Sequence, residues 1–122
     1  MDLQDDGSRL HEDPRIRRLL SDCPFLAERL DLSEGPYGVA GEVALLLRDG
    51  ALSNAEANFV FAHLHRMAEG DVESQNLLVV GILEVLGDTP QSIARVRRGL
   101  GAGPARPLFE RVLKGWITRR PN

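Results

Sequence analysis

The sequence predicts an all-α protein of five to seven short helices. Apolar residues recur at intervals of three and four along most of the chain, which places them on one face of a helix. Capping residues, prolines and glycines separate these stretches, and no stretch reads convincingly as a strand. The expected connections are two to six residues long. Successive helices should therefore be antiparallel neighbours, stacked as α-hairpins in a HEAT-like bundle.

The chain begins with a polar segment. Residues 1–13 are acidic and lack an apolar period, which predicts a flexible tail before a single helical domain over residues 14–118. Asp13 followed by proline is typical of a helix start, because proline at the first helical position loses no useful N–H. A second start is expected at Pro24.

Two longer helices are expected between residues 36 and 69. The first follows Pro36 and ends at Asp49 and the glycine after it. Before the second, Ser53 and Glu56 have the capping-box spacing, in which each side chain satisfies a free backbone N–H. The core stripe of this second helix consists of Ala57, Val60, Phe61, Leu64 and Ala68.

Residues 71–86 are apolar on all sides near their centre, so periodicity alone would also fit a buried strand. Length favours a helix, because the pattern continues from Asp71 to Leu86. We expect a central helix covered on most sides, in which Gly81 permits a close helix crossing. Glu84 within it either meets an arginine from residues 95–98 or binds a partner.

Two more helices complete the expected fold. Thr89 and the following proline open one, and the last carries an apolar stripe that includes Trp116. Between them, residues 99–104 are rich in glycine. No strand precedes this segment and no Gly-Lys-Ser/Thr motif follows it, so it is interpreted as an ordinary turn rather than a phosphate-binding loop.

Charge is distributed unevenly along the chain. Residues 1–91 carry seven arginines against 17 Asp and Glu, whereas residues 92–122 carry eight Arg and Lys against Glu110 alone. The acidic body suggests a basic protein partner. The basic end leaves nucleic acid as a less favoured partner. Its cations are Arg95, Arg97, Arg98, Arg106, Arg111, Lys114, Arg119 and Arg120.

No spacing of residues predicts a catalytic or metal site. His63 and His65 are two residues apart on a helix and point in different directions, and His11 belongs to the predicted tail. All three are expected at the surface. Cys23, the single cysteine, has acidic neighbours that would not favour a thiolate. We therefore expect no enzymatic activity, no cofactor and no metal.

The sequence also lacks signals for a membrane. The longest purely apolar run, residues 77–83, is far shorter than the ~20 residues of a membrane span. No apolar segment of a signal peptide is visible near Met1. With one cysteine and no disulfide partner for it, the expected location is the cytoplasm.

Residues 54–116 carry a resemblance to a known family. The residues responsible are Phe61, Leu64, Gly70, Asp71, Gly81, Glu84, Leu86, Phe109 and Trp116. With them, about half of the chain resembles a family of small, mostly uncharacterised helical bacterial proteins. Some members look like immunity proteins encoded beside polymorphic toxins. The resemblance implies a non-enzymatic protein that neutralises a cognate toxin by covering its active face.

The leading interpretation is a cytoplasmic immunity protein whose acidic side, between residues 34 and 73, binds a basic, nuclease-like toxin. Alternatives are a helical adaptor or scaffold with another protein partner and, less favoured, a nucleic-acid-binding regulator. Phe59 lies opposite the core stripe, where either a neighbouring helix covers it or it anchors a partner. The predicted contact residues are Glu42, Asp49, Glu56, Phe59, Glu69, Asp71 and Glu73.

Overall fold

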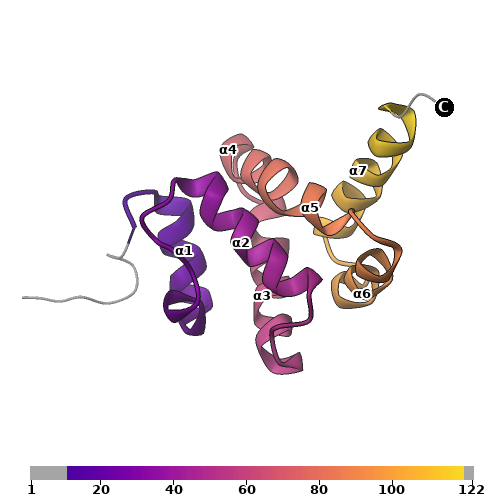
Figure 1. Cartoon of the computed structure of the whole chain (residues 1–122). Coiled ribbons are helices and arrows are strands. Elements are labelled where there is room, and N and C mark those ends of the chain that lie inside the picture. The colour runs from indigo at the N-terminus through magenta and orange to yellow at the C-terminus, as the bar shows by residue number, and fades with distance from the viewer. Residues whose placement is uncertain (1–10, 120–122) are drawn as a thin grey trace, which may run out of the picture.

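The computed structural model describes residues 11–119, with side chains up to residue 115, and every regular element in this part is a helix (Figure 1). The all-α prediction is confirmed. The elements are α1 (Pro14–Asp22), the 3₁₀ helix η2 (Pro24–Glu28), α2 (Pro36–Arg48), α3 (Asn54–Ala68), α4 (Val72–Asn76), the π-helix η3 (Leu77–Leu83), α5 (Glu84–Leu86), α6 (Pro90–Leu100) and α7 (Ala105–Arg119).

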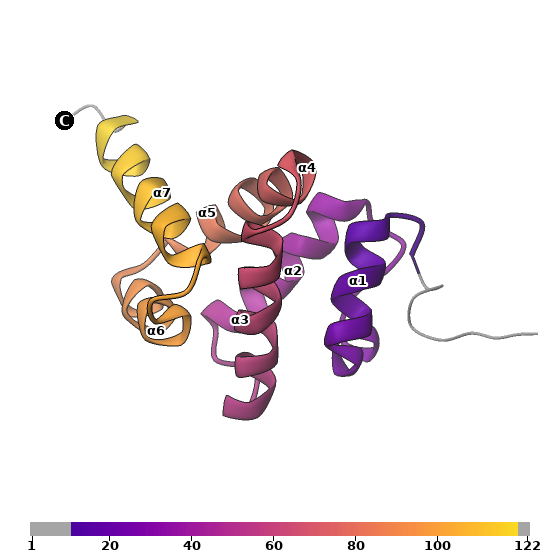
Figure 2. The ribbon, with the colours of Figure 1, turned by 180° about the vertical axis from the view of Figure 1, so that it is seen from behind.

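The helices pack around α2, α3 and η3. The most extensive contact joins α2 to η3, although α3 separates them in sequence, and α3 contacts α1, α4, α6 and α7. Figures 1 and 2 show α1 at one end of the molecule and α6 and α7 at the other. In a stack of α-hairpins the main contacts would join consecutive helices, so the HEAT-like arrangement is not confirmed.

The expected caps form where the sequence places them. The Asp13 side chain accepts a hydrogen bond from the backbone N–H of Arg15 at the start of α1. At the start of α3, the Glu56 N–H donates to the Ser53 hydroxyl at 3.1 Å, and the Ser53 N–H donates to Glu56 Oε1 at 3.0 Å. At the start of α4, the Asp71 side chain accepts a hydrogen bond from the backbone N–H of Ser74. Local polar side chains therefore determine where these helices begin.

The predicted core stripe of α3 is confirmed, with Val60, Phe61 and Leu64 buried. The prediction that His63 lies at the surface is wrong: only 4% of this residue is exposed. His63 follows Val60 by three residues and precedes the buried Met67 by four, so it shares their side of the helix. That spacing could have revealed its burial.

The helix predicted over residues 71–86 is confirmed as the continuous run of α4, η3 and α5. Its π-helical centre was not predicted from the pattern. A Cβ atom added to Gly81 would lie 2.9 Å from the Cβ of Ala40, closer than real Cβ contacts allow. The expected close crossing at Gly81 therefore exists, and α2 is the helix that crosses there.

The glycine-rich segment of residues 99–104, at the end of α6 and after it, differs from the expected simple turn. Gly99 lies inside α6, where the Phe61 ring occupies the space that a Cβ atom would need. Gly103 meets the imidazole of His65 in the same way. Gly101, with φ +55°, makes the turn itself. Two glycines are therefore needed for close packing and one for its backbone conformation.

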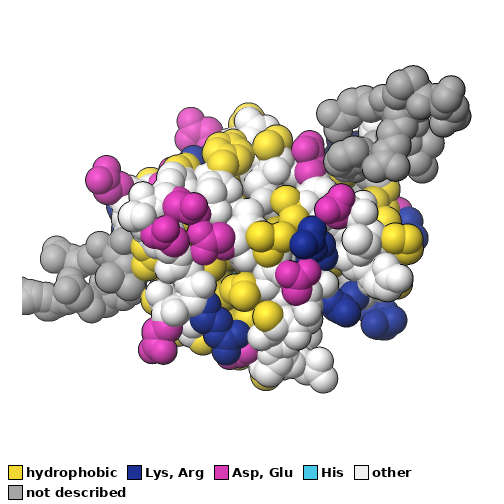
Figure 3. All heavy atoms as spheres, viewed as in Figure 1, with side chains coloured by type: hydrophobic (Ala, Val, Ile, Leu, Met, Phe, Trp, Pro, Cys, Tyr) yellow, Lys and Arg dark blue, Asp and Glu magenta, His cyan; other side chains and the backbone are white. Residues whose placement is uncertain are grey.

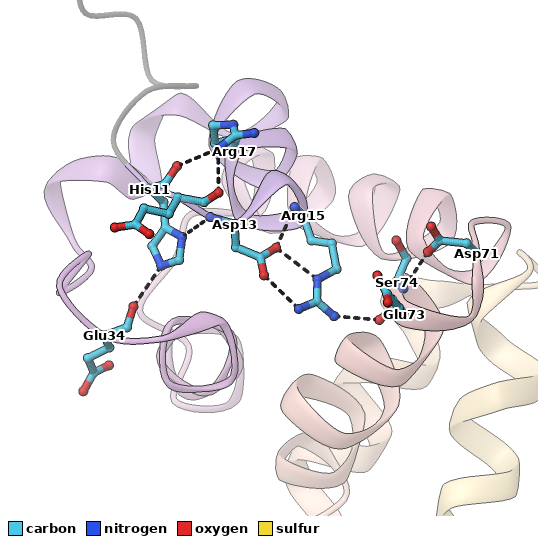
Figure 4. A network of polar contacts seen from close by, with 9 residues as sticks. His11, Asp13, Arg15, Arg17, Glu34, Asp71, Glu73 and Ser74 are labelled. Carbon is cyan, nitrogen blue, oxygen red and sulfur yellow. Dashed lines mark hydrogen bonds and ion pairs between the residues drawn. The ribbon is translucent and has the colours of Figure 1, made fainter.

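The predicted tail is only partly within the described structure, because residues 1–10 lie outside it. His11 and Asp13 belong to the folded part: His11 Nε2 lies 2.8 Å from the Glu34 carbonyl oxygen, and the Asp13 N–H donates to His11 Nδ1 at 2.9 Å (Figure 4). The side chains of Trp116 and Arg119, and all of Arg120, also lie outside the described part. No helix in that part is long and apolar enough to span a membrane.

Candidate functional site

The seven predicted contact residues are spread over α2, α3 and the start of α4. Glu56 and Phe59 lie in the first two turns of α3, whereas Glu69 follows its last residue. At 1.5 Å per residue, Glu56 and Glu69 are about 20 Å apart along the helix. Glu42 and Asp49 lie on α2 and at its C-terminal cap.

Phe59 is exposed, as its position opposite the core stripe predicted. Its exposed fraction is 59%, and its ring lies 6.5 Å from the ring of Phe25 in a tilted arrangement. Nearby, Glu56 caps α3 and forms an ion pair with Arg29 at 3.1 Å. The carboxylate beside Phe59 thus already has an arginine partner within the chain.

The acidic residues between α3 and α4 also have structural roles (Figure 4). Asp71 Oδ1 accepts the Ser74 N–H at 2.8 Å, and hydrogen bonds from Ser74 lower the pKa of Asp71. The backbone carbonyl of Glu73 accepts a hydrogen bond from Arg15. Glu69 is the exposed cap residue of α3. Asp71 therefore fixes the start of α4, and the backbone of Glu73 links α4 to Arg15 of α1.

Glu42 belongs to a cluster of three carboxylates at the start of α2. Its Oε1 accepts the Asp31 N–H at 3.0 Å. A hydrogen bond with Glu42, together with the nearby negative charges, raises the pKa of Glu34. Like charges close together disfavour ionisation of both. The cluster of Asp31, Glu34 and Glu42 is therefore a place where a positive charge from outside would be stabilised.

Exposed apolar side chains lie next to this cluster. Tyr37 and Leu45 on α2 are 43% and 40% exposed, and Val80 on η3 is 52% exposed. Gly41 lies between the two α2 residues, and a Cβ atom there would meet nothing within 4 Å. We call Tyr37, Gly41, Leu45 and Val80 the α2–η3 face.

Figure 3 shows hydrophobic side chains over the middle of this side of the molecule, with carboxylates on either side of them and Lys or Arg side chains among them. At the end of α2, Asp49 and Asp88 both pair with Arg48, each at 3.1 Å. Sequence reasoning missed the α2–η3 face. Tyr37 and Leu45 are eight residues apart and recur on the side of α2 away from its buried stripe, which was the available signal.

Several cations of the basic C-terminal segment are used inside the molecule. Arg97 and Arg106 both donate to the Glu110 carboxylate at 2.8 Å, and these hydrogen bonds lower the pKa of Glu110 to about 2. Arg95 donates to the backbone carbonyls of Leu47 and Arg48. These arginines fix α6 to α7 and to the end of α2, so fewer remain to contact phosphates.

A hollow of about 270 Å³ lies between α1, α3 and the start of α4. We call it the arginine-lined hollow. Residues on its wall come from three parts of the chain and include both signs of charge. They are Arg15, Arg18, Asp22, His63, Arg66, Met67, Gly70, Asp71 and Ser74. Arg15, Arg18 and Asp22 recur at intervals of three and four on α1, a polar stripe that the sequence analysis did not use.

His63 is the buried polar group of this wall. Its Nδ1 lies 2.7 Å from Asp22 Oδ2, and Arg66 Nη1 lies 3.4 Å from Asp22 Oδ1. Burial lowers the pKa of His63, although the Asp22 carboxylate acts in the opposite direction. The neutral ring therefore carries its proton on Nδ1 and donates it to Asp22.

Cys23, next to Asp22 in sequence, is fully buried, and burial raises the pKa of its thiol to about 12. Over residues 11–119, no three His, Cys, Asp or Glu side chains come together as a metal site would require.

Comparisons of the chain with protein-family models, with curated proteins and with solved structures find no match.

Proposed function

We propose that the chain is an immunity-type inhibitor that acts in the cytoplasm and binds a basic toxin domain through the α2–η3 face. The observation that carries the proposal is the combination of exposed apolar side chains and clustered carboxylates on one side of the molecule. Interfaces of this kind use an apolar centre for affinity and a charged rim for steering.

The carboxylate cluster explains why the partner should be basic. A hydrogen bond with Glu42 and, to a smaller extent, repulsion from the charges of Glu42 and Asp31 raise the pKa of Glu34 in the free protein. An Arg or Lys side chain of the partner would relieve that repulsion when it binds. Charges at such a rim mainly increase the rate of association and make it sensitive to salt.

The surface around Phe59 is the main competitor. Phe59 is more exposed than Leu45, but Glu56 beside it is already paired with Arg29 and caps α3. The α2–η3 face instead has a cluster of carboxylates that repel one another. This difference favours the α2–η3 face over the Phe59 surface that the sequence suggested.

The test is co-expression with the product of the neighbouring gene, with growth and complex formation as the two measurements. Leu45→Arg should abolish protection and co-purification, because it places a large cation at the centre of the interface. Phe59→Arg is the matched control, an exposed apolar residue changed in the same way on another helix, and should retain both. Circular dichroism would first confirm that both variants fold.

Two outcomes would contradict the proposal. If the neighbouring gene product is harmless alone and does not co-purify, the immunity function is wrong, and the adaptor or scaffold alternative replaces it. If Phe59→Arg loses protection while Leu45→Arg keeps it, the inhibitor uses the Phe59 surface and our assignment of the α2–η3 face is wrong.

A further inference from the structure

The walls of the arginine-lined hollow come from α1, α3 and the start of α4. The hollow adjoins the α2–η3 face at Arg15, whose guanidinium carbon lies 5.9 Å from the centre of the Tyr37 ring. Its three arginines are not equivalent. Arg15 makes two hydrogen bonds to the Asp13 carboxylate and a third to the Glu73 carbonyl oxygen, so its donors are largely occupied (Figure 4). It serves as a fixed part of the wall.

The other two arginines have donors to spare. Arg18 is exposed and makes no hydrogen bond or ion pair within residues 11–119. The side chain of Arg66 is 70% exposed, and within the described residues its guanidinium makes one polar contact, at 3.4 Å to Asp22 Oδ1. A guanidinium offers five N–H donors in a planar fork that matches a carboxylate. Two such groups, one from α1 and one from α3, border the same hollow.

His63 supplies a second and independent observation. It is 4% exposed, lines the hollow and uses Nδ1 for Asp22. Its other ring nitrogen, Nε2, has no hydrogen-bond partner in the part of the chain that the structure describes. Because Nδ1 carries the proton of the neutral ring, Nε2 is an acceptor. A buried acceptor without a partner costs free energy, so this atom is suited to an O–H or N–H donor that enters the hollow.

From this geometry we infer that the hollow binds a small organic acid that also carries an O–H or N–H group. Arg18 and Arg66 hold its carboxylate, and the O–H or N–H group donates a hydrogen bond to Nε2 of His63. Asp22 and Asp71 on the same wall would repel a second negative charge, which favours a singly charged carboxylate over a phosphate dianion. The volume equals that of roughly nine water molecules in the liquid, so the acid has room for a carbon body beside the buried Met67.

The three histidines of the chain make the experiment selective. His65 accepts a hydrogen bond from the Ala105 N–H and His11 contacts Glu34, both outside the hollow. Sodium mandelate, a carboxylate that carries an O–H group, should shift the imidazole NMR signals of His63 along a saturable curve when it is added to the full chain at constant ionic strength. The signals of His11 and His65 should stay unchanged. Inorganic phosphate at pH 8, where it is mostly a dianion, should bind at least tenfold more weakly than mandelate.

Arg18→Gln should weaken mandelate binding at least tenfold, and it should fold normally because Arg18 makes no hydrogen bond to another residue of the described part of the chain. Arg98→Gln, a change at an exposed arginine of α6, is the matched control and should leave the dissociation constant within twofold of the wild type. The inference is overturned if His63 does not respond. It is also overturned if all three histidines shift together, if phosphate binds as well as mandelate, or if Arg98→Gln weakens binding as much as Arg18→Gln.

Discussion

Substitutions at two helical glycines, Gly81 and Gly41, should change the stability of the protein in opposite directions. Gly81 crosses α2 so closely that a Cβ atom would lie 2.9 Å from the Cβ of Ala40, while Gly41 has nothing within 4 Å of the corresponding position. Gly81→Leu must therefore push apart the most extensive helix contact in the molecule, between α2 and η3. Overpacking of this kind costs about 1–3 kcal/mol.

Gly41→Ala is the matched change at the open position. Alanine is favoured over glycine inside a helix by about 1 kcal/mol, and here its methyl group meets no neighbour. We expect the melting temperature of Gly41→Ala to rise by roughly 3–6 °C and that of Gly81→Leu to fall by a similar or larger amount. Thermal unfolding followed by far-UV circular dichroism would measure both shifts.

The two variants together test the packing. If Gly81→Leu melts like the wild type, the close crossing of α2 and η3 is wrong and the helix over residues 72–86 is not central. If Gly41→Ala is destabilising instead, the outer side of α2 is covered by another part of the chain. In that case the α2–η3 face would not be available to a partner either.

Two further predictions concern titratable groups. A hydrogen bond with Arg15 holds the pKa of Asp13 at about 2, below its ordinary value of 3.8, so its stabilisation is complete above about pH 5 and is lost as the pH falls towards 2. Asp13→Ala, which also removes the cap of α1, should cost about 1–2 kcal/mol at pH 7 in urea unfolding and less at pH 3, and an equal loss at both would contradict the assignment. Asp22→Asn should lower the pKa of His63 further in an NMR titration, because Asp22 is the group that raises it. Asp88→Asn, at a carboxylate paired with Arg48, should leave that pKa unchanged, and an unchanged value in both variants would show that Asp22 does not act on His63.

The candidate sites were less predictable from the sequence than the helices. The exposure of Phe59 followed from its position opposite the stripe of α3, and the structural use of Asp71 and Glu56 followed from their capping positions. The spacing of His63 from Val60 and Met67 could have revealed its burial, but its contact with Asp22 could not be read from spacing, because the two residues are 41 positions apart. The same applies to the hollow, whose arginines come from α1 and α3.

By itself, the sequence determined the all-α class and the starts of α1, α3, α4 and α6. Caps and apolar stripes act over three or four residues, so they depend little on the rest of the fold. Only the tertiary structure decided that α2 packs mainly on η3 across the intervening α3, that η3 is π-helical, and which polar residues meet. These features arise from the packing of segments that are distant in sequence. The side chains of two such segments must be complementary in both volume and charge, and no local sequence pattern specifies which segments will meet.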